Sequence, residues 1–266
     1  MPRPYHADAD GVITDAHYEQ RVSGWDVRRW REFQPFVDKM KALIGGKGRV
    51  LDLGAGEGFL TRCCIENGLD AVGLEGSPVA VRWGRESLGI DIRAHNLKDP
   101  LLFTGAMFDL VMYHDVYEHV PDRVNRVVFP EAFRVLKCDG FFWVITTCRY
   151  DLVECAELEH INNPTPTELL RYGTAHGFEG RILRPAFNIS LFTPWFYDRN
   201  FNVKGWKRRL RHALETRHRM ISLIFAPLWL PVWYLNARLL HIPLLDFVGR
   251  TSNVLFKKPG LGDSKE

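Results

Sequence analysis

A short apolar segment that runs directly into three closely spaced glycines constrains this fold more than any other feature. Residues 49–53, RVLDL, have the composition of a buried strand, and Gly54, Gly56 and Gly58 follow at once. A glycine turn between a strand and a helix lets backbone N–H groups come close to a ligand, because no side chain blocks the approach. The segment therefore predicts a strand, a turn and a helix that together bind a nucleotide or nucleoside.

Short apolar runs alternate with longer mixed segments from Arg49 to Thr147, which is typical of a parallel sheet covered by helices. Residues 59–68 have helical spacing, and a second helix is expected to end at Asp139-Gly140 after a bend or interruption at Pro130. A capped helix is expected to start near Thr165 or Thr167. The expected strands are 49–53, 70–75, 90–95, 108–114, 140–147, 178–183 and 252–259.

The length of 266 residues and a hydrophobic fraction of 46% suit one α/β domain that spans residues 1–266. Residues 1–48 are expected to form an N-terminal helical cap, in which Tyr18, Trp25 and Trp30 are interpreted as packing residues. Residues 188–251 differ in composition from the rest and are expected to form a helical insertion before the last strand.

The insertion combines a basic segment with an apolar one. Residues 204–219 hold seven Lys or Arg against one acid, and residues 220–237 hold no charge. Pro227 and Pro231 interrupt the apolar run, which favours a helical hairpin on an anionic membrane surface over a span. A lid packed on the same domain is an equal alternative, and a partner-protein surface is a third.

The net charge and the cysteine content indicate which partners and which cellular compartment to expect. The net charge of +3 is too small to indicate a nucleic-acid partner, which would need a concentrated basic face. Five cysteines without a CxxC pair, and an N-terminal stretch without a secretory apolar run, favour a reduced cytoplasmic protein. If the insertion binds lipid, we expect a peripheral location at the inner face of a membrane.

Two acidic residues accompany the glycine turn. Asp52 lies at the end of the first strand, and Glu75 closes the next strand, where a carboxylate can accept both ribose hydroxyls of a nucleoside. The third glycine of a dinucleotide fingerprint would fall at position 59, which is Phe59. The pattern therefore argues against a nicotinamide cofactor.

The sequence resembles the class I S-adenosylmethionine-dependent methyltransferases through VLDLGAGEG, GLEGSP, FDLVMYHDVYEHVP and LKCDGFFWVIT, which occur in the family's order. The resemblance covers residues 50–178, returns at NVLFKK, and implies a Rossmann-like seven-stranded sheet of order 3-2-1-4-5-7-6 with helices on both faces. It implies S-adenosylmethionine as the cofactor, with Glu75 on the ribose and Asn96 where many relatives place an Asp against adenine. We therefore predict as cofactor-binding residues Asp52, Gly54, Ala55, Gly56, Glu75, Gly76, Asn96, Leu97 and His114.

The segment after the fourth strand carries the candidates for catalysis, which are Asp115, Glu118 and His119, together with His160 further along the chain. Transfer of a methyl group to a hydroxyl needs a base for the hydroxyl proton, and imidazole suits that task near neutral pH. We favour His119 or His160 as the base. An alternative is that these acids and histidines hold a divalent cation that polarises the acceptor, but we expect no resident metal.

The predicted function is transfer of a methyl group to a small-molecule, sugar or lipid-linked hydroxyl. Family members that methylate amide or adenine nitrogen usually carry Asn/Asp-Pro-Pro-aromatic after the fourth strand, whereas HDVY stands at residues 114–117. This difference favours oxygen as the acceptor, and methylation of a small amine is a further alternative. The alternative is a catalytically silent cofactor-binding module that tethers a membrane or a partner. The polar cluster from Asp115 to His119 favours the enzyme, because a silent module does not need it.

Overall fold

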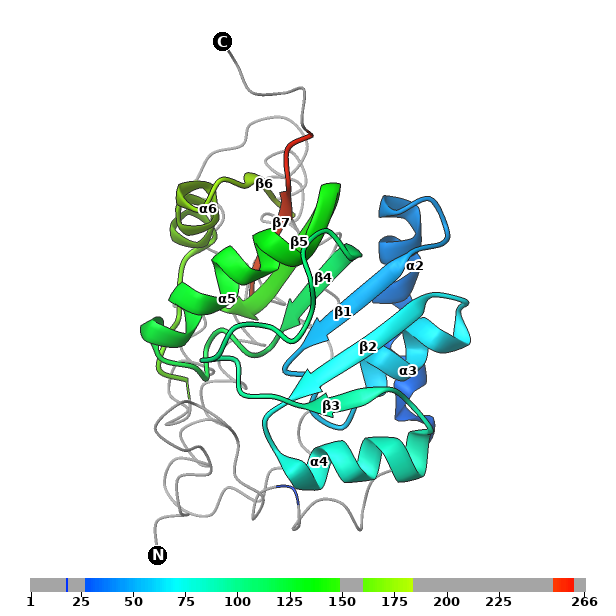
Figure 1. Cartoon of the computed structure of the whole chain (residues 1–266). Helices are drawn as coiled ribbons and strands as arrows, with labels where there is room; N and C mark the ends of the chain where they lie inside the picture. The colour runs from blue at the N-terminus through cyan, green and yellow to red at the C-terminus, as the bar shows by residue number, and fades with distance from the viewer. Residues whose placement is uncertain (1–17, 19–26, 149–159, 184–250, 261–266) are drawn as a thin grey trace, which may run out of the picture.

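The computed structural model describes residue 18 and residues 27–148, 160–183 and 251–260 (Figure 1). Its centre is a seven-stranded sheet in the order β3-β2-β1-β4-β5-β7-β6. Neighbours pair in parallel from β3 to β5, and β7 is antiparallel to both β5 and β6. The predicted fold class and strand order are confirmed.

The strands are β1 (Arg49–Leu53), β2 (Asp70–Glu75), β3 (Ile92–Ala94), β4 (Phe108–His114), β5 (Leu136–Thr147), β6 (Glu179–Ile182) and β7 (Thr251–Lys257). The α-helices are α2 (Gln34–Leu43), α3 (Phe59–Glu66), α4 (Pro78–Trp83), α5 (Asp122–Val135) and α6 (Pro166–Ala175). A 3₁₀ segment, η1 (Val27–Phe33), precedes α2, and a π-helical turn, η2 (Gly84–Leu88), extends α4.

Helices cover both faces of the sheet (Figure 1). Side chains alternate between the two faces of a strand, so that in β4 Val111 and Tyr113 pack in the core beneath α5 and α6. Leu110 and Met112 pack in a second core, beneath α2 and α3. Because both faces of the central strands are buried, β1 and β4 are rich in apolar residues, which is why they stand out in the sequence.

The boundary between α5 and β5 differs from the prediction. The helix ends at Val135 and is not interrupted at Pro130, because its buried side chains pack along the sheet on both sides of the proline. β5 then starts at Leu136, and its pairing jumps from Phe108↔Leu136 to Leu110↔Phe141. The Asp139-Gly140 turn, read in the sequence as a helix end, lies within this bulge, where Asp139 has a φ of 62°.

The predicted cap of the helix after β5 is confirmed at Thr165. The Thr165 side chain accepts a hydrogen bond from the Glu168 N–H at 3.2 Å. The Glu168 carboxylate in turn accepts one from the Thr165 N–H at 2.8 Å, and Pro166 occupies the first helical position. This capping box satisfies donors that the first turn of α6 leaves without intrahelical partners.

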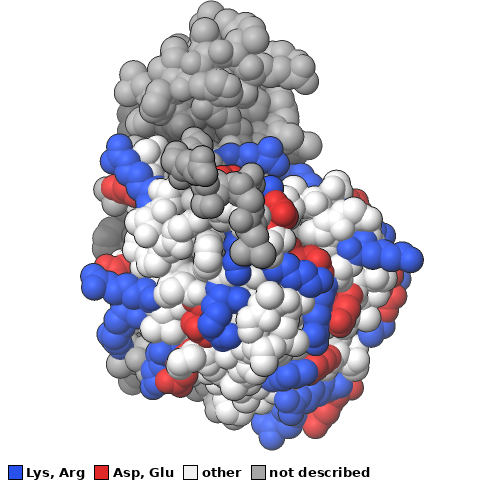
Figure 2. Space-filling view, turned by 45° about the horizontal axis from the view of Figure 1, so that its top comes forward, with Lys and Arg blue, Asp and Glu red and all other residues white. Residues whose placement is uncertain are grey.

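Residues 184–250 hold nearly all of the predicted insertion and lie outside the described residues, as do residues 1–17 and 19–26 of the predicted N-terminal cap. Of the helices that the structure describes, none has the length and apolar character needed to cross a bilayer. The face of the described residues shown in Figure 2 carries acidic and basic side chains intermixed. Ion pairs such as Lys137–Asp109, at 2.9 Å, join side chains of opposite charge on the surface.

Candidate active site

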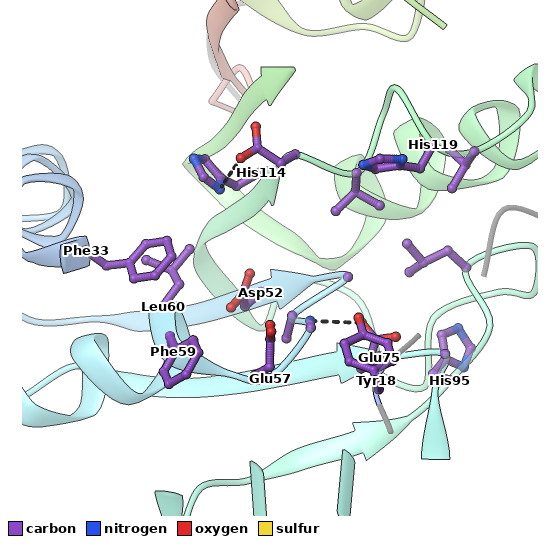
Figure 3. Close-up of a pocket in the computed structure, with 18 of the residues that line it drawn as sticks. Tyr18, Phe33, Asp52, Glu57, Phe59, Leu60, Glu75, His95, His114 and His119 are labelled. Carbon is purple, nitrogen blue, oxygen red and sulfur yellow. Dashed lines mark hydrogen bonds and ion pairs between the residues drawn. The ribbon is translucent and has the colours of Figure 1, made fainter. Parts of the chain in front are cut away.

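A cavity of about 320 Å³ lies at the carboxyl ends of β1, β2 and β4, where an open parallel sheet places its ligands (Figure 3). It is lined by every residue that the sequence predicts to bind the cofactor and by two of the four predicted catalytic residues, Asp115 and His119. In Figure 3, His114 and His119 stand along one wall, and Glu75 and His95 lie on the opposite side.

The floor of the cavity is the glycine turn between β1 and α3. Gly54, Gly56 and Gly58 have φ values of 68°, 55° and 87°, a region that residues with a side chain rarely adopt. A Cβ at Gly54 would lie 2.5 Å from Cγ2 of Val116, the residue two positions beyond the end of β4. Glycine is therefore required here both by conformation and by the close approach of the two loops.

Glu75 ends β2 and is buried against this turn. Its carboxylate accepts hydrogen bonds from the Gly56 N–H and the Ser77 N–H, both at 2.9 Å. Burial raises the pKa of Glu75 to about 7, although the hydrogen bonds from these two backbone groups act in the opposite direction. A ligand that donates hydrogen bonds or carries positive charge would favour the ionised form of this carboxyl.

Asp52, in β1, is the second buried acid of the cavity. Its carboxylate accepts a hydrogen bond from the Thr61 hydroxyl at 2.8 Å. Burial raises the pKa of Asp52 to about 6, while the bond from Thr61 and the nearby His114 favour the charged form. The cavity therefore holds two carboxyls that ionise more readily once a cation is present.

Asn96 and Leu97 line the far end of the cavity, after β3. The side-chain oxygen of Asn96 accepts a hydrogen bond from the Lys98 N–H at 3.1 Å, so this residue shapes its own turn. Its amide N–H groups and the second lone pair of its oxygen remain for a ligand. The adenine-binding role of Asn96 stays a prediction.

His114 and Asp115 occupy the end of β4. The His114 ring lies edge-on to Phe36, with ring centroids 5.0 Å apart, and its Nδ1 is 3.6 Å from Oδ2 of Asp115. Asp115 has a φ of 52°, a strained conformation for a non-glycine residue, and its N–H donates to the Ile145 carbonyl at 2.9 Å. The strain turns the chain sharply away from the strand at the cavity wall.

The remaining predicted catalytic residues, Glu118, His119 and His160, form a cluster at the edge of the cavity. Side-chain ligand atoms of Glu118, His119 and His160 all lie within 4.8 Å of one another, and the two histidine rings meet edge to face with centroids 4.8 Å apart. Among the described residues His119 lines the cavity, whereas His160 and Glu118 do not. The structure thus brings together residues more than forty positions apart in the sequence, with His119 at the cavity surface.

Sequence reasoning missed several residues of the wall, among them Arg29, Tyr18 and Glu57. Arg29, in η1, lines the cavity and places its guanidinium 5.2 Å from the centroid of the Phe59 ring. Tyr18 is buried, packs with Val79 and Ala80, and also lines the cavity, so it is more than the packing residue expected. Glu57 lies within the glycine turn itself. No local pattern marks Arg29 or Tyr18, because their position depends on how the N-terminal segment crosses the strand ends.

The strand order and the glycine turn with its buried acids define a class I S-adenosylmethionine-dependent methyltransferase fold. Residues 51–144 match the family model described as "Methyltransferase domain". This segment is therefore similar to a methyltransferase domain, and the cofactor of that family is S-adenosylmethionine.

Individual relatives agree with this assignment. A ubiquinone biosynthesis O-methyltransferase from Hahella chejuensis is 32% identical over 138 residues, which are 46% of this chain and 56% of that protein. The chain thus matches little more than half the length of this curated relative. Among solved structures, a SAM-dependent methyltransferase from Archaeoglobus fulgidus has a TM-score of 0.57 at 13% identity, covering 91% of this chain and 99% of that one. A putative sarcosine dimethylglycine methyltransferase from Galdieria sulphuraria has a TM-score of 0.56 at 15% identity, covering 95% and 94%. At these identities the solved structures show the shared fold.

The residues of the cavity fit S-adenosylmethionine in shape and in charge. The turn at Gly54 leaves backbone exposed where a Cβ would not fit, and the carboxyl of Glu75 lies beside it. Four acids, Asp52, Glu57, Glu75 and Asp115, line the cavity together with the guanidinium of Arg29. This balance suits a ligand with a sulfonium, an ammonium and one carboxylate, and it opposes a dinucleotide, whose pyrophosphate the acids would repel.

Proposed function

We propose that this protein transfers the methyl group of S-adenosylmethionine to a hydroxyl oxygen of a small-molecule, sugar or lipid-linked acceptor. The observation that carries the proposal is that His119 lines the same cavity as the glycine turn and Glu75. A base is therefore available in the space where cofactor and acceptor would meet.

In this proposal Glu75 holds the ribose hydroxyls, and Asp52 and Arg29 hold the charged amino-acid end of the cofactor. When bound, S-adenosylmethionine supplies an electrophilic methyl group on a sulfonium and departs as a neutral thioether. His119 takes the hydroxyl proton as the acceptor oxygen forms its bond to carbon. His160, whose ring lies against His119, supports the imidazolium that results.

An oxygen acceptor is supported by HDVY at residues 114–117, which stands where nitrogen-methylating relatives carry their proline motif. The relative from Hahella chejuensis is an O-methyltransferase, which points in the same direction. The acceptor class depends on residues 188–250. As a membrane-binding hairpin they favour a lipid-linked hydroxyl at the inner face of a membrane, and as a lid they favour a soluble one.

The test follows labelled methyl from S-adenosylmethionine into lipid, aqueous and protein fractions of a cell extract from the source. Wild type, His119→Ala, His160→Ala and the double variant are compared, each with and without chelator. Loss of label in the His119→Ala reaction supports the proposal, and the fraction that carries the label gives the acceptor class. If both single variants and the double variant transfer methyl at the wild-type rate, neither histidine is the base. Binding of the cofactor without transfer of labelled methyl into any fraction favours the catalytically silent tethering module.

A further inference from the structure

Glu118 is a buried acid near the proposed reaction centre. It is 1% exposed, and the described lining of the cavity does not include it. Its carboxyl accepts a hydrogen bond from the Thr146 hydroxyl at 2.8 Å and one from the Thr147 N–H at 3.3 Å, both at the end of β5. These contacts point the carboxyl toward β5 rather than toward a substrate.

The backbone of Glu118 holds a third segment. Its carbonyl oxygen accepts hydrogen bonds from the Ile161 N–H at 2.8 Å and the Asn162 N–H at 3.1 Å, immediately after His160. The same short segment is fixed to β5 by the Thr147 hydroxyl, which donates to the Asn163 side-chain oxygen at 2.7 Å. One residue thus joins the loop after β4, the end of β5 and the segment that carries His160.

From these contacts we infer that Glu118 is a positioning residue, which holds the His160 ring against His119 instead of acting on the substrate. The inference rests on the proposed function, in which His119 is the base, and replaces the catalytic role expected from the sequence. Two observations support it: the hydrogen bonds of Glu118 lead away from the cavity, and the histidine pair is placed by the two segments that Glu118 connects.

The charge state of Glu118 makes the inference testable. Burial, with a further contribution from Asp115, raises the pKa of Glu118, which favours the protonated form of this carboxyl. Glutamine has the same shape as a protonated glutamate. Its amide can accept from the Thr147 N–H and donate to the Thr146 hydroxyl oxygen, so that Glu118→Gln should preserve the connection. Alanine removes both side-chain contacts to β5 and leaves the Thr146 hydroxyl without its partner, but its backbone carbonyl still accepts from Ile161 and Asn162. Glu118→Ala therefore tests the link to β5.

The experiment records nuclear Overhauser contacts between the ring protons of His119 and His160 in the isotope-labelled full chain. We expect the contacts in wild type, in Glu118→Gln and in the exposed control Glu179→Gln, and their loss in Glu118→Ala. Titration with S-adenosylmethionine checks folding, since each variant should bind the cofactor within about two-fold of wild type, as expected for a change outside the cofactor contacts. Methyl transfer at saturating cofactor should fall by roughly ten-fold or more in Glu118→Ala, a part of what a positioned base supplies, and stay within about three-fold in Glu118→Gln.

Two results would overturn the inference: loss of the ring contacts in Glu118→Gln as well, or their persistence in Glu118→Ala. A third would be a shift of the His119 and His160 ring signals on addition of Zn²⁺ to wild type that Glu118→Gln abolishes, because Glu118 would then be a metal ligand. Failure of the proposed function is distinguishable, since wild type would then transfer no methyl group while the ring contacts still report on Glu118.

Discussion

Replacement of Asp52 by asparagine should stabilise the ligand-free protein, and by an amount that depends on pH. Burial raises the pKa of Asp52 from 3.8 to about 6. An acid whose pKa is raised in the folded state does not lower the free energy of unfolding while it is protonated in both the folded and the unfolded protein. Its destabilising effect develops as the pH rises from the lower to the higher of the two pKa values, and it is complete above the higher one. A shift of this size corresponds to a penalty of about 3 kcal/mol near pH 8 and about 1 kcal/mol near pH 4.5.

Asparagine has no charge to desolvate and keeps an oxygen that can accept from the Thr61 hydroxyl, so Asp52→Asn should recover most of this penalty. Denaturant unfolding of both proteins near pH 8 and pH 4.5 gives the free energies of unfolding. The gain should be larger near pH 8 by about 2 kcal/mol. Asp99→Asn is the control, because it removes the same charge at an exposed position. A gain independent of pH, or a less stable variant near pH 8, would refute the reasoning.

Three further predictions concern the glycine turn, the two buried acids and the N-terminal cap of α6. Gly54→Ala should abolish binding of S-adenosylmethionine in a calorimetric titration, because its Cβ would lie 2.5 Å from Val116; binding near the wild-type affinity would contradict the geometry of the turn. Affinity for the cofactor should fall as pH is lowered from about 8 to 5.5, since protonation of Asp52 and Glu75 removes the charges that attract it, and a flat profile would count against their role. Thr165→Ala should lower the free energy of unfolding by about 1 kcal/mol through loss of the capping box, whereas the exposed Thr167→Ala should change it by less than about 0.5 kcal/mol; equal effects would argue against the cap.

Local sequence patterns predicted most of the sheet. β1 and β4 agree with the predicted segments residue for residue, because an apolar run buried on both faces contrasts sharply with the turn that follows it. The start of β5 was predicted wrongly, since Asp139-Gly140 is as suitable for a helix end as for a bulge. Pairing with β4 decides between them, and pairing is a long-range property that no local pattern reports.

The candidate site, like the sheet, could be predicted from the sequence only in part. Residues at the ends of β1, β2 and β4 could be predicted to meet, because the carboxyl ends of parallel strands share one edge of the sheet. Arg29 could not be predicted, since its place in the wall depends on how η1 crosses that edge. The spacing of Asp115, Glu118 and His119 predicts a catalytic role for Glu118, whereas its hydrogen bonds to β5 could be known only from the structure.

Calorimetric titration of the full chain with S-adenosylmethionine, its demethylated product and NAD tests the central claim most directly. The charges and the glycine turn of the cavity predict that the first two ligands bind at a single site, that Glu75→Gln weakens both, and that NAD gives no heat of binding. Binding of NAD as tight as that of S-adenosylmethionine, or no binding of S-adenosylmethionine to the wild-type chain, would contradict the account.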